Sequence, residues 1–250
     1  MKRFLLTYLA LATALTGFAQ AKKRHHRQSE LGFFGGGSYY IGDINPRTHF
    51  RDSHMAGGLF YRFSNNYRFS FRLGFNYGTL SGDDATSGEP DQIERNLNFH
   101  TKLYELAGTT EFNFVEYRIG HDRYKFTLFI FAGASAFRFD PISNSGALLR
   151  EQNNEAQSKA YPRLQLSIPF GVGLKFNVGK KCGLGVEWGP RRTFTDYLDD
   201  IRGVYPDNGS SSALAGDMRG NPSTRDWYFY YGLTLNIKLR EAHRPCFKGI

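Results

Sequence analysis

Apolar and polar residues alternate strictly along several stretches of this chain. Between residues 162 and 178 every second residue is apolar, and Arg163, Gln165 and Lys175 stand among the residues in between. Because successive side chains of a β-strand point to opposite faces, this pattern predicts a strand with one apolar face. In a soluble sandwich that face would be buried, whereas in a membrane barrel it would face lipid. The alternation alone leaves both possibilities open.

Eight segments carry this alternation and predict eight strands. The strands are expected over residues 31–41, 55–63, 67–79, 102–114, 124–138, 162–178, 182–192 and 227–239. The second, fourth and sixth connections between them are short, whereas the first, third, fifth and seventh are long and polar. Such segregation is typical of outer-membrane barrels, whose short turns lie in the periplasm and whose long loops are extracellular.

We therefore predict an all-β fold, an eight-stranded antiparallel up-and-down transmembrane β-barrel over residues 30–240. The strands reach the length of about 9–11 residues that a tilted membrane strand needs. An interior of eight strands is just wide enough for side chains to fill. The register places these charged residues inside: Arg68, Arg72, Glu105, Glu111, Lys175, Glu187 and Arg191. Opposite charges can pair there, as buried charges require, so we expect a structural network and no pore.

The N-terminal residues predict export. Lys2 and Arg3 precede an apolar run of signal-peptide length that ends in small residues, so residues 1–19 are expected to form a signal peptide. Residues 20–29 form a basic segment, expected to be a solvated tail. The formal net charge of the chain is +9, but export argues against nucleic acid as a partner. Outer-membrane lipid is the expected surrounding.

Cys182 and Cys246 are the two cysteines of the chain. Both are expected on the periplasmic side, Cys182 at the sixth turn and Cys246 in a C-terminal tail over residues 241–250. The seven residues from Leu239 to Cys246 can span up to roughly 23–25 Å. A disulfide between the two is therefore feasible in an oxidising compartment. Two free or partner-linked thiols are the alternative.

Signals for catalysis or cofactor binding are weak. The loop over residues 43–55 holds His49, Ser53 and His54, the residue types of a nucleophile and a base, so a lipid-modifying barrel enzyme is one alternative function. The acidic cluster within residues 193–203 lacks the spacing of an EF-hand, which favours loop packing. No metal, cofactor or small-molecule substrate is expected. A surface adhesion or ligand-binding barrel acting through the long loops is a further alternative.

Motifs along nearly the whole chain resemble one known family. In order they are ELGFFGGGSYYIGDINP, GLFYRF, TLSGDD, RNLNFHTKLYELAGTTEFNF, FIFAGASAFRFDP, LSIPFGVGLKFNV, GVEWGPRRTFTDYLDDI and RGNPSTRDWYFYYG. From about residue 30 to residue 239 the chain resembles the PorG-like outer-membrane proteins of Bacteroidota. The most specific part is TFTDYLDD with the later RGNP and DWYF.

The resemblance implies a non-enzymatic component of the type IX protein secretion system, which exports proteins across the outer membrane. PorG-like barrels are taken to tie a periplasmic ring, formed by the lipoprotein PorK and its partner PorN, to that membrane. The family has no catalytic residues to carry over.

A partner is then expected at the periplasmic end. Basic and apolar residues project there from the sixth turn and the tail: Lys180, Lys181, Cys182, Arg244, Cys246, Phe247 and Lys248. Ordinary turn and tail residues are an equally simple interpretation of this set, so partner binding through it is a hypothesis.

Overall fold

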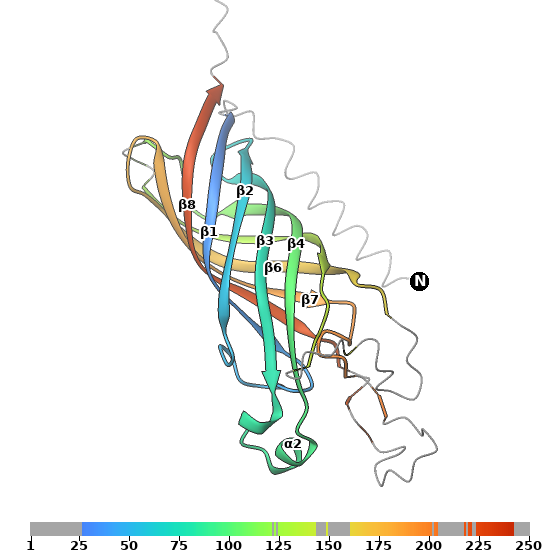
Figure 1. Cartoon of the computed structure of the whole chain (residues 1–250). Coiled ribbons are helices and arrows are strands. Elements are labelled where there is room, and N and C mark those ends of the chain that lie inside the picture. Colours follow the sequence, from blue (N-terminus) through green and yellow to red (C-terminus); the bar gives the residue numbers. More distant parts are fainter. Residues whose placement is uncertain are drawn as a thin grey trace, which may run out of the picture.

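Eight β-strands form a closed barrel in which each strand pairs antiparallel with the next and the last pairs with the first (Figure 1). The strands are β1 (Arg27–Ile41), β2 (His54–Ser64), β3 (Phe69–Asp83), β4 (Asn98–Asn113), β5 (Phe126–Arg138), β6 (Leu164–Asn177), β7 (Cys182–Thr193) and β8 (Trp227–Ala242). This computed structural model describes residues 27–121, 123, 125–143, 149, 161–201, 203, 204, 218, 220, 221 and 224–242. The predicted fold class is confirmed.

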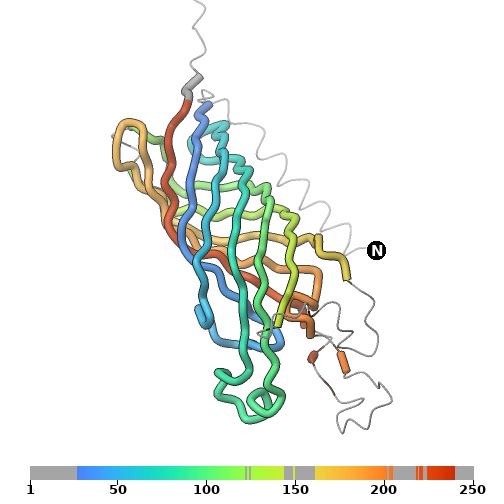
Figure 2. The backbone as a smooth tube through the Cα atoms, in the orientation of Figure 1, coloured from blue at the N-terminus to red at the C-terminus, as the bar shows by residue number. Residues whose placement is uncertain are grey.

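Two short helices lie in the loop between β3 and β4. They are η1 (Asp84–Thr86) and α2 (Pro90–Arg95). None of the helices in the described ranges is long and apolar enough to cross a membrane. We call the end that carries this loop, with the other long loops after β1, β5 and β7, the long-loop end; the opposite end is the short-turn end. Figure 2 traces the same path as a tube.

The strands differ from the predicted ones mainly in length. β3 continues to Asp83 and β4 begins at Asn98, so the two form a hairpin that projects at the long-loop end (Figure 1). The residues added there have polar side chains at outward positions, as Ser81 does. The apolar alternation therefore stops before the strand ends, and the predicted strand was too short. β1 begins at Arg27, so the barrel includes the last residues of the predicted basic segment.

The outward positions of the strands form an apolar belt. Exposed members are Leu59, Tyr61, Phe71, Leu73, Phe75, Leu106, Ile130, Leu164, Leu166, Ile168, Val172, Val186, Leu233 and Leu235. A contiguous apolar surface around a closed barrel is the lipid-facing surface of a membrane protein. In β6 the predicted orientation is confirmed, since Leu164, Leu166 and Ile168 are exposed whereas Lys175 is buried inside.

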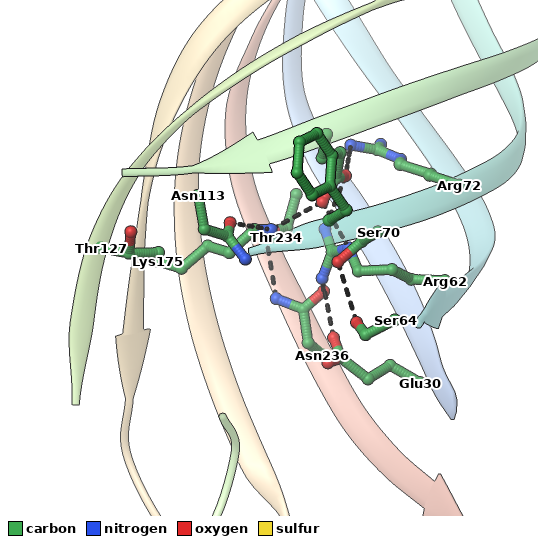
Figure 3. Close-up of polar contacts among 12 residues, drawn as sticks. Glu30, Arg62, Ser64, Ser70, Arg72, Asn113, Thr127, Lys175, Thr234 and Asn236 are labelled. Carbon is green, nitrogen blue, oxygen red and sulfur yellow. Dashed lines mark hydrogen bonds and ion pairs between the residues drawn. The ribbon is translucent and has the colours of Figure 1, made fainter. Parts of the chain in front are cut away.

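Charged side chains meet across the lumen of the barrel (Figure 3). The Arg62 guanidinium donates to Glu30 Oε2 at 2.8 Å and to Glu111 Oε1 at 3.1 Å. Lys175 Nζ donates to Glu111 Oε2 at 2.6 Å, and Arg72 donates to Glu187 Oε2 at 2.7 Å. All these side chains are buried, so the lumen is packed at this level and each charge has an opposite charge beside it.

Most of the predicted interior residues belong to this network or to a second network nearer the long-loop end. Nearer the long-loop end, Glu105 Oε2 accepts hydrogen bonds from Tyr228 Oη at 2.7 Å and from Arg191 Nε at 3.3 Å. The prediction for Arg68 is wrong. β3 begins one residue later, so Arg68 lies exposed in the preceding turn and donates to the carbonyl of Phe114.

We predict that Arg62→Met lowers the free energy of unfolding by about 3–5 kcal/mol, because Glu30 would lose its buried cation and Glu111 would keep only part of its charge compensation. Urea unfolding in lipid vesicles, followed by the mobility difference between folded and unfolded barrel, measures the change. The exposed Arg68→Met is the matched control and should shift stability by less than about 0.5 kcal/mol. Equal shifts in the two variants would contradict a stabilising role for the network.

Candidate functional site

The predicted partner-binding residues fall partly within the described structure. Lys180, Lys181 and Cys182 are exposed at the turn between β6 and β7, at the short-turn end. The other four, Arg244, Cys246, Phe247 and Lys248, lie outside the described residues. Cys182 is a free, exposed thiol in the structure. Because Cys246 is among the residues not described, the bridge between the two stays a prediction.

The connection between β4 and β5 packs against the β6–β7 turn. Its Tyr117 and Ile119 are buried, and Tyr117 Oη donates to the carbonyl of Phe176 at 3.2 Å. Asn177 Nδ2 donates to the carbonyl of Arg118 at 3.3 Å, while Asn177 Oδ1 accepts from the amide of Gly120 at 3.1 Å. These bonds join the two turns into one surface, which we call the turn platform (residues 114–121 and 177–182).

A glycine is required where the two turns touch. Gly120 has φ +83°, a left-handed conformation that side chains disfavour, and a Cβ there would collide with the carbonyl of Lys180. The sequence suggested a plain short turn at this place. Two apolar residues within a polar turn, Tyr117 and Ile119, are the signal that indicates a packed one.

Cations dominate the surface around the turn platform. Exposed side chains there are Arg68, Arg123, Lys125, Lys180 and Lys181, and Lys238 reaches the carbonyl of Ile119 at 3.5 Å. Against them, the described part of the β4–β5 connection holds the acid Glu116. A concentration of one sign of charge attracts a surface of the opposite sign and speeds its association.

At the long-loop end a buried acidic pair fastens the last loop to β1. Tyr40 Oη donates to Asp199 Oδ2 and also lies 3.1 Å from Asp226 Oδ1. The other oxygens accept backbone hydrogen bonds, Asp199 from Ile201 at 3.0 Å and Asp226 from Leu198 at 2.8 Å. This arrangement, the acid clamp, gives the acidic cluster the loop-packing role that the sequence favoured.

Protonation of the acid clamp follows from its burial. Burial raises the pKa of Asp199 well above the ordinary 3.8, and the nearby Asp43 raises it further. Burial likewise raises the pKa of Asp226, with the charge of Asp199 adding to the effect. A single tyrosine hydroxyl donates one hydrogen bond. A proton retained on one carboxyl therefore satisfies the second contact with Tyr40.

We predict that the last loop docks more tightly as the pH falls. Because the folded pKa of Asp199 and of Asp226 lies above the ordinary value, the docked loop binds more protons than the released loop. The docking free energy is fully present below pH of about 3.8 and declines as the pH rises through the raised pKa values. Protection is measured by amide hydrogen exchange over residues 195–201, corrected for its intrinsic pH dependence. It should be about tenfold greater below pH of about 3.8 than above the raised pKa values.

The matched variants separate this effect from general acid sensitivity. Asp199→Asn removes one titrating group and should flatten the pH dependence of protection. Asp91→Asn, at an exposed position of α2, should leave it as in the unmodified protein. Protection that rises with pH, or that depends on pH equally in all three proteins, would contradict the clamp.

The three residues proposed for a catalytic loop do not converge. Ser53 Oγ donates to the carbonyl of Phe50 at 2.9 Å, whereas His49 Nδ1 lies 3.0 Å from Tyr39 Oη on the outer wall. His54 Nε2 instead lies 2.6 Å from Ser81 Oγ on β3. The sequence placed Ser81 in a loop, so this serine–histidine pair could not be found from spacing.

The closed barrel, its apolar belt and its charge-paired lumen define the class of the protein, a transmembrane β-barrel. A family model described as "Domain of unknown function (DUF6089)" matches residues 6–249, and the chain belongs to this family. Comparison with curated proteins finds no significant match.

Several solved structures are similar to this chain. Ail of Yersinia pestis, solved in complex with the heparin analogue sucrose octasulfate, is 13% identical over 86% of this chain and 100% of its own, with a TM-score of 0.44. Neisserial surface protein A is 8% identical over 84% of this chain and 97% of its own, with a TM-score of 0.47. The outer membrane enzyme PagL is 13% identical over 84% of this chain and 99% of its own, with a TM-score of 0.32.

Proposed function

We propose that this protein is a non-enzymatic outer-membrane component of the type IX secretion machinery that anchors the periplasmic PorK/PorN ring to the outer membrane. The PorG-like motifs of the sequence suggest this role, and the observation that carries it is the basic turn platform. In this proposal the short turns and the C-terminus face the periplasm, and the long loops lie outside the cell.

The turn platform has the properties that an anchor needs. Its two turns are fastened to each other through Asn177, so they present Lys180 and Lys181 from a fixed position. A partner with an acidic surface would pair with these exposed cations without deforming the barrel. Charge complementarity of this kind sets the association rate and the choice of partner more than it sets raw affinity.

Reversing the charge of the turn platform tests the anchor. Lys180→Glu combined with Lys181→Glu should lower the recovery of the ring proteins with affinity-tagged barrel by about tenfold, because like charges would then meet. Isolation from outer membranes at two salt concentrations, with quantitative mass spectrometry, measures the recovery.

The matched control reverses two exposed cations at the opposite end, Arg47→Glu with Lys102→Glu, and should leave the recovery unchanged. Folding of each variant is checked by the gel mobility of the unheated barrel. If the folded platform variant recovers as much of the ring proteins as the unmodified protein does, the turn platform does not bind the ring.

A second candidate function, a lipid-modifying barrel enzyme, is favoured by the contact between His54 and Ser81. An imidazole within hydrogen-bond reach of a serine hydroxyl is the first requirement of a serine nucleophile. Ser81 Oγ would attack an ester carbonyl of a lipid while His54 accepts the serine proton and passes it to the leaving alcohol. Water would then release the acyl group. Both side chains are half-buried near the long-loop end.

The two serines near His54 distinguish this candidate. Ser81→Ala should abolish any acyl removal that depends on this barrel, whereas Ser53→Ala should leave it unchanged, because Ser53 bonds the carbonyl of Phe50. Mass spectrometry of outer-membrane lipids from the variant strains and from a deletion strain gives the measurement. Lipid profiles that do not change even in the deletion strain would exclude the candidate.

A further inference from the structure

Part of the loop after β1 folds back over the outer wall of the barrel. Tyr39 points outward between the inward-facing Ser38 and Tyr40, yet it is 0% exposed. His49 and Phe50, which we call the loop hook, cover it. The Tyr39 hydroxyl lies 3.0 Å from His49 Nδ1, and the rings of Tyr39 and Phe50 are 4.9 Å apart.

The stagger of the strands brings the loop hook over the middle of β7. Trp188, midway along β7, pairs with Tyr231 near the start of β8, and Tyr231 pairs with Gly37 near the end of β1. Trp188 Nε1 donates to Tyr39 Oη at 3.0 Å, and the ring of Phe50 meets that of Tyr231 edge to face at 5.0 Å. The hook therefore spans three strands of the lipid-facing wall.

Beside the loop hook lies an open groove of about 760 Å³. Besides the hook and Trp188, its walls include Leu128, Val172, Val186 and Leu233. Glu187 contributes only backbone, because its carboxylate bonds Arg72 inside the barrel. The groove is thus lined mainly by apolar surface, with His49, Trp188 and Tyr231 as the lining side chains that carry a polar group. Its volume falls within the range of about 300–1,000 Å³ that small-molecule sites occupy.

Positive charge lies between this groove and the long loops. Arg192 is exposed on the outer face of β7, two outward positions beyond Trp188. Arg225, just before β8, has its guanidinium 5.8 Å from the ring of Phe194. Since β7 and β8 pair Arg192 with Trp227, both cations lie at the same edge of the lipid-facing wall, where lipid headgroups are found.

We propose that the groove binds one acyl chain of an anionic, phosphate-bearing membrane lipid, whose headgroup contacts Arg192 and Arg225. Hydrocarbon surrounds the groove, so burial of apolar surface gives no preference for one lipid over another. Selectivity must come from close packing under the loop hook and from charge at the headgroup. Basic residues beside a membrane favour anionic lipid by about fivefold each. This site is independent of the turn platform and of the anchoring role.

The two tryptophans of the chain allow a direct test. Trp227→Phe leaves Trp188, in the wall of the groove, as the only tryptophan. The variant is placed in phosphatidylcholine nanodiscs that contain a small fraction of phosphatidylglycerol with brominated acyl chains, which quench a neighbouring indole. Quenching of Trp188 should be several-fold stronger than with the same fraction of brominated phosphatidylcholine.

Further substitutions in the Trp227→Phe background identify the two parts of the site. Phe50→Ala should reduce quenching to that expected from random contact, and Arg192→Gln with Arg225→Gln should remove the preference for phosphatidylglycerol. Phe75→Ala, on a different part of the apolar belt, is the control and should change neither. The proposal is overturned if the folded Trp227→Phe variant is quenched equally by both brominated lipids, or if the preference survives loss of both arginines.

Discussion

The ion pairs of Arg62 with Glu30 and Glu111 are the interaction on which the rest of this barrel depends. Closing eight strands directs every second side chain into a narrow lumen, where an uncompensated charge would be too costly to keep. Arg62 bridges β1 to β4 across that lumen, and Lys175 brings β6 to the same Glu111 carboxylate. With the polar half of each strand neutralised inside, the apolar half can form an uninterrupted lipid-facing surface.

Charged side chains fill the lumen at the level of Arg62, and tyrosines fasten the loops at the two ends of the barrel and on its outer wall. Tyr39 and Tyr40 are neighbours in β1 but point to opposite faces. Tyr39 holds the loop hook on the outside through His49, whereas Tyr40 holds the acid clamp on the inside through Asp199. Tyr117 does the same for the turn platform. Each ring supplies a large apolar contact and a hydroxyl that joins a loop to a strand. Tyr39 and Tyr40 lie on β1 and contact polar groups of a loop, whereas Tyr117 lies in the β4–β5 connection and donates to the carbonyl of Phe176 on β6.

The alternation in the sequence is sufficient to predict the strands, the lipid-facing side and most of the lumen. These features depend only on the two-residue repeat of side-chain direction along a strand, and not on contacts between residues far apart in the sequence. The predictions of lumen residues failed where they depended on the exact residue at which a strand begins. The alternation assigns Arg68 to the lumen although β3 begins after it, and Glu30 lies before the expected start of the first strand. Arg62 was missed for another reason, because it lies at an inward position within an expected strand and its partners are remote in the sequence. Two contacts between strands were also beyond reach. His54 meets Ser81 because β3 continues past the end expected at residue 79, and Trp188 meets Tyr39 over β8 only because β8 pairs with β1 and closes the sheet.

The β6–β7 hairpin links the turn platform to the wall of the lipid groove. Its turn is fastened by Asn177, its middle by the Glu187–Arg72 ion pair, and its far end by Thr193 Oγ1, which donates to the carbonyl of Asp226 at 2.6 Å. A shift of one strand past the other would break these polar contacts, and the Glu187–Arg72 pair and the Thr193 hydrogen bond are buried and therefore costly to leave unsatisfied. Lys180 at one end and Arg192 at the other are therefore held at a constant separation across the membrane. Such rigidity suits an anchor, which has to transmit position from the membrane to a partner.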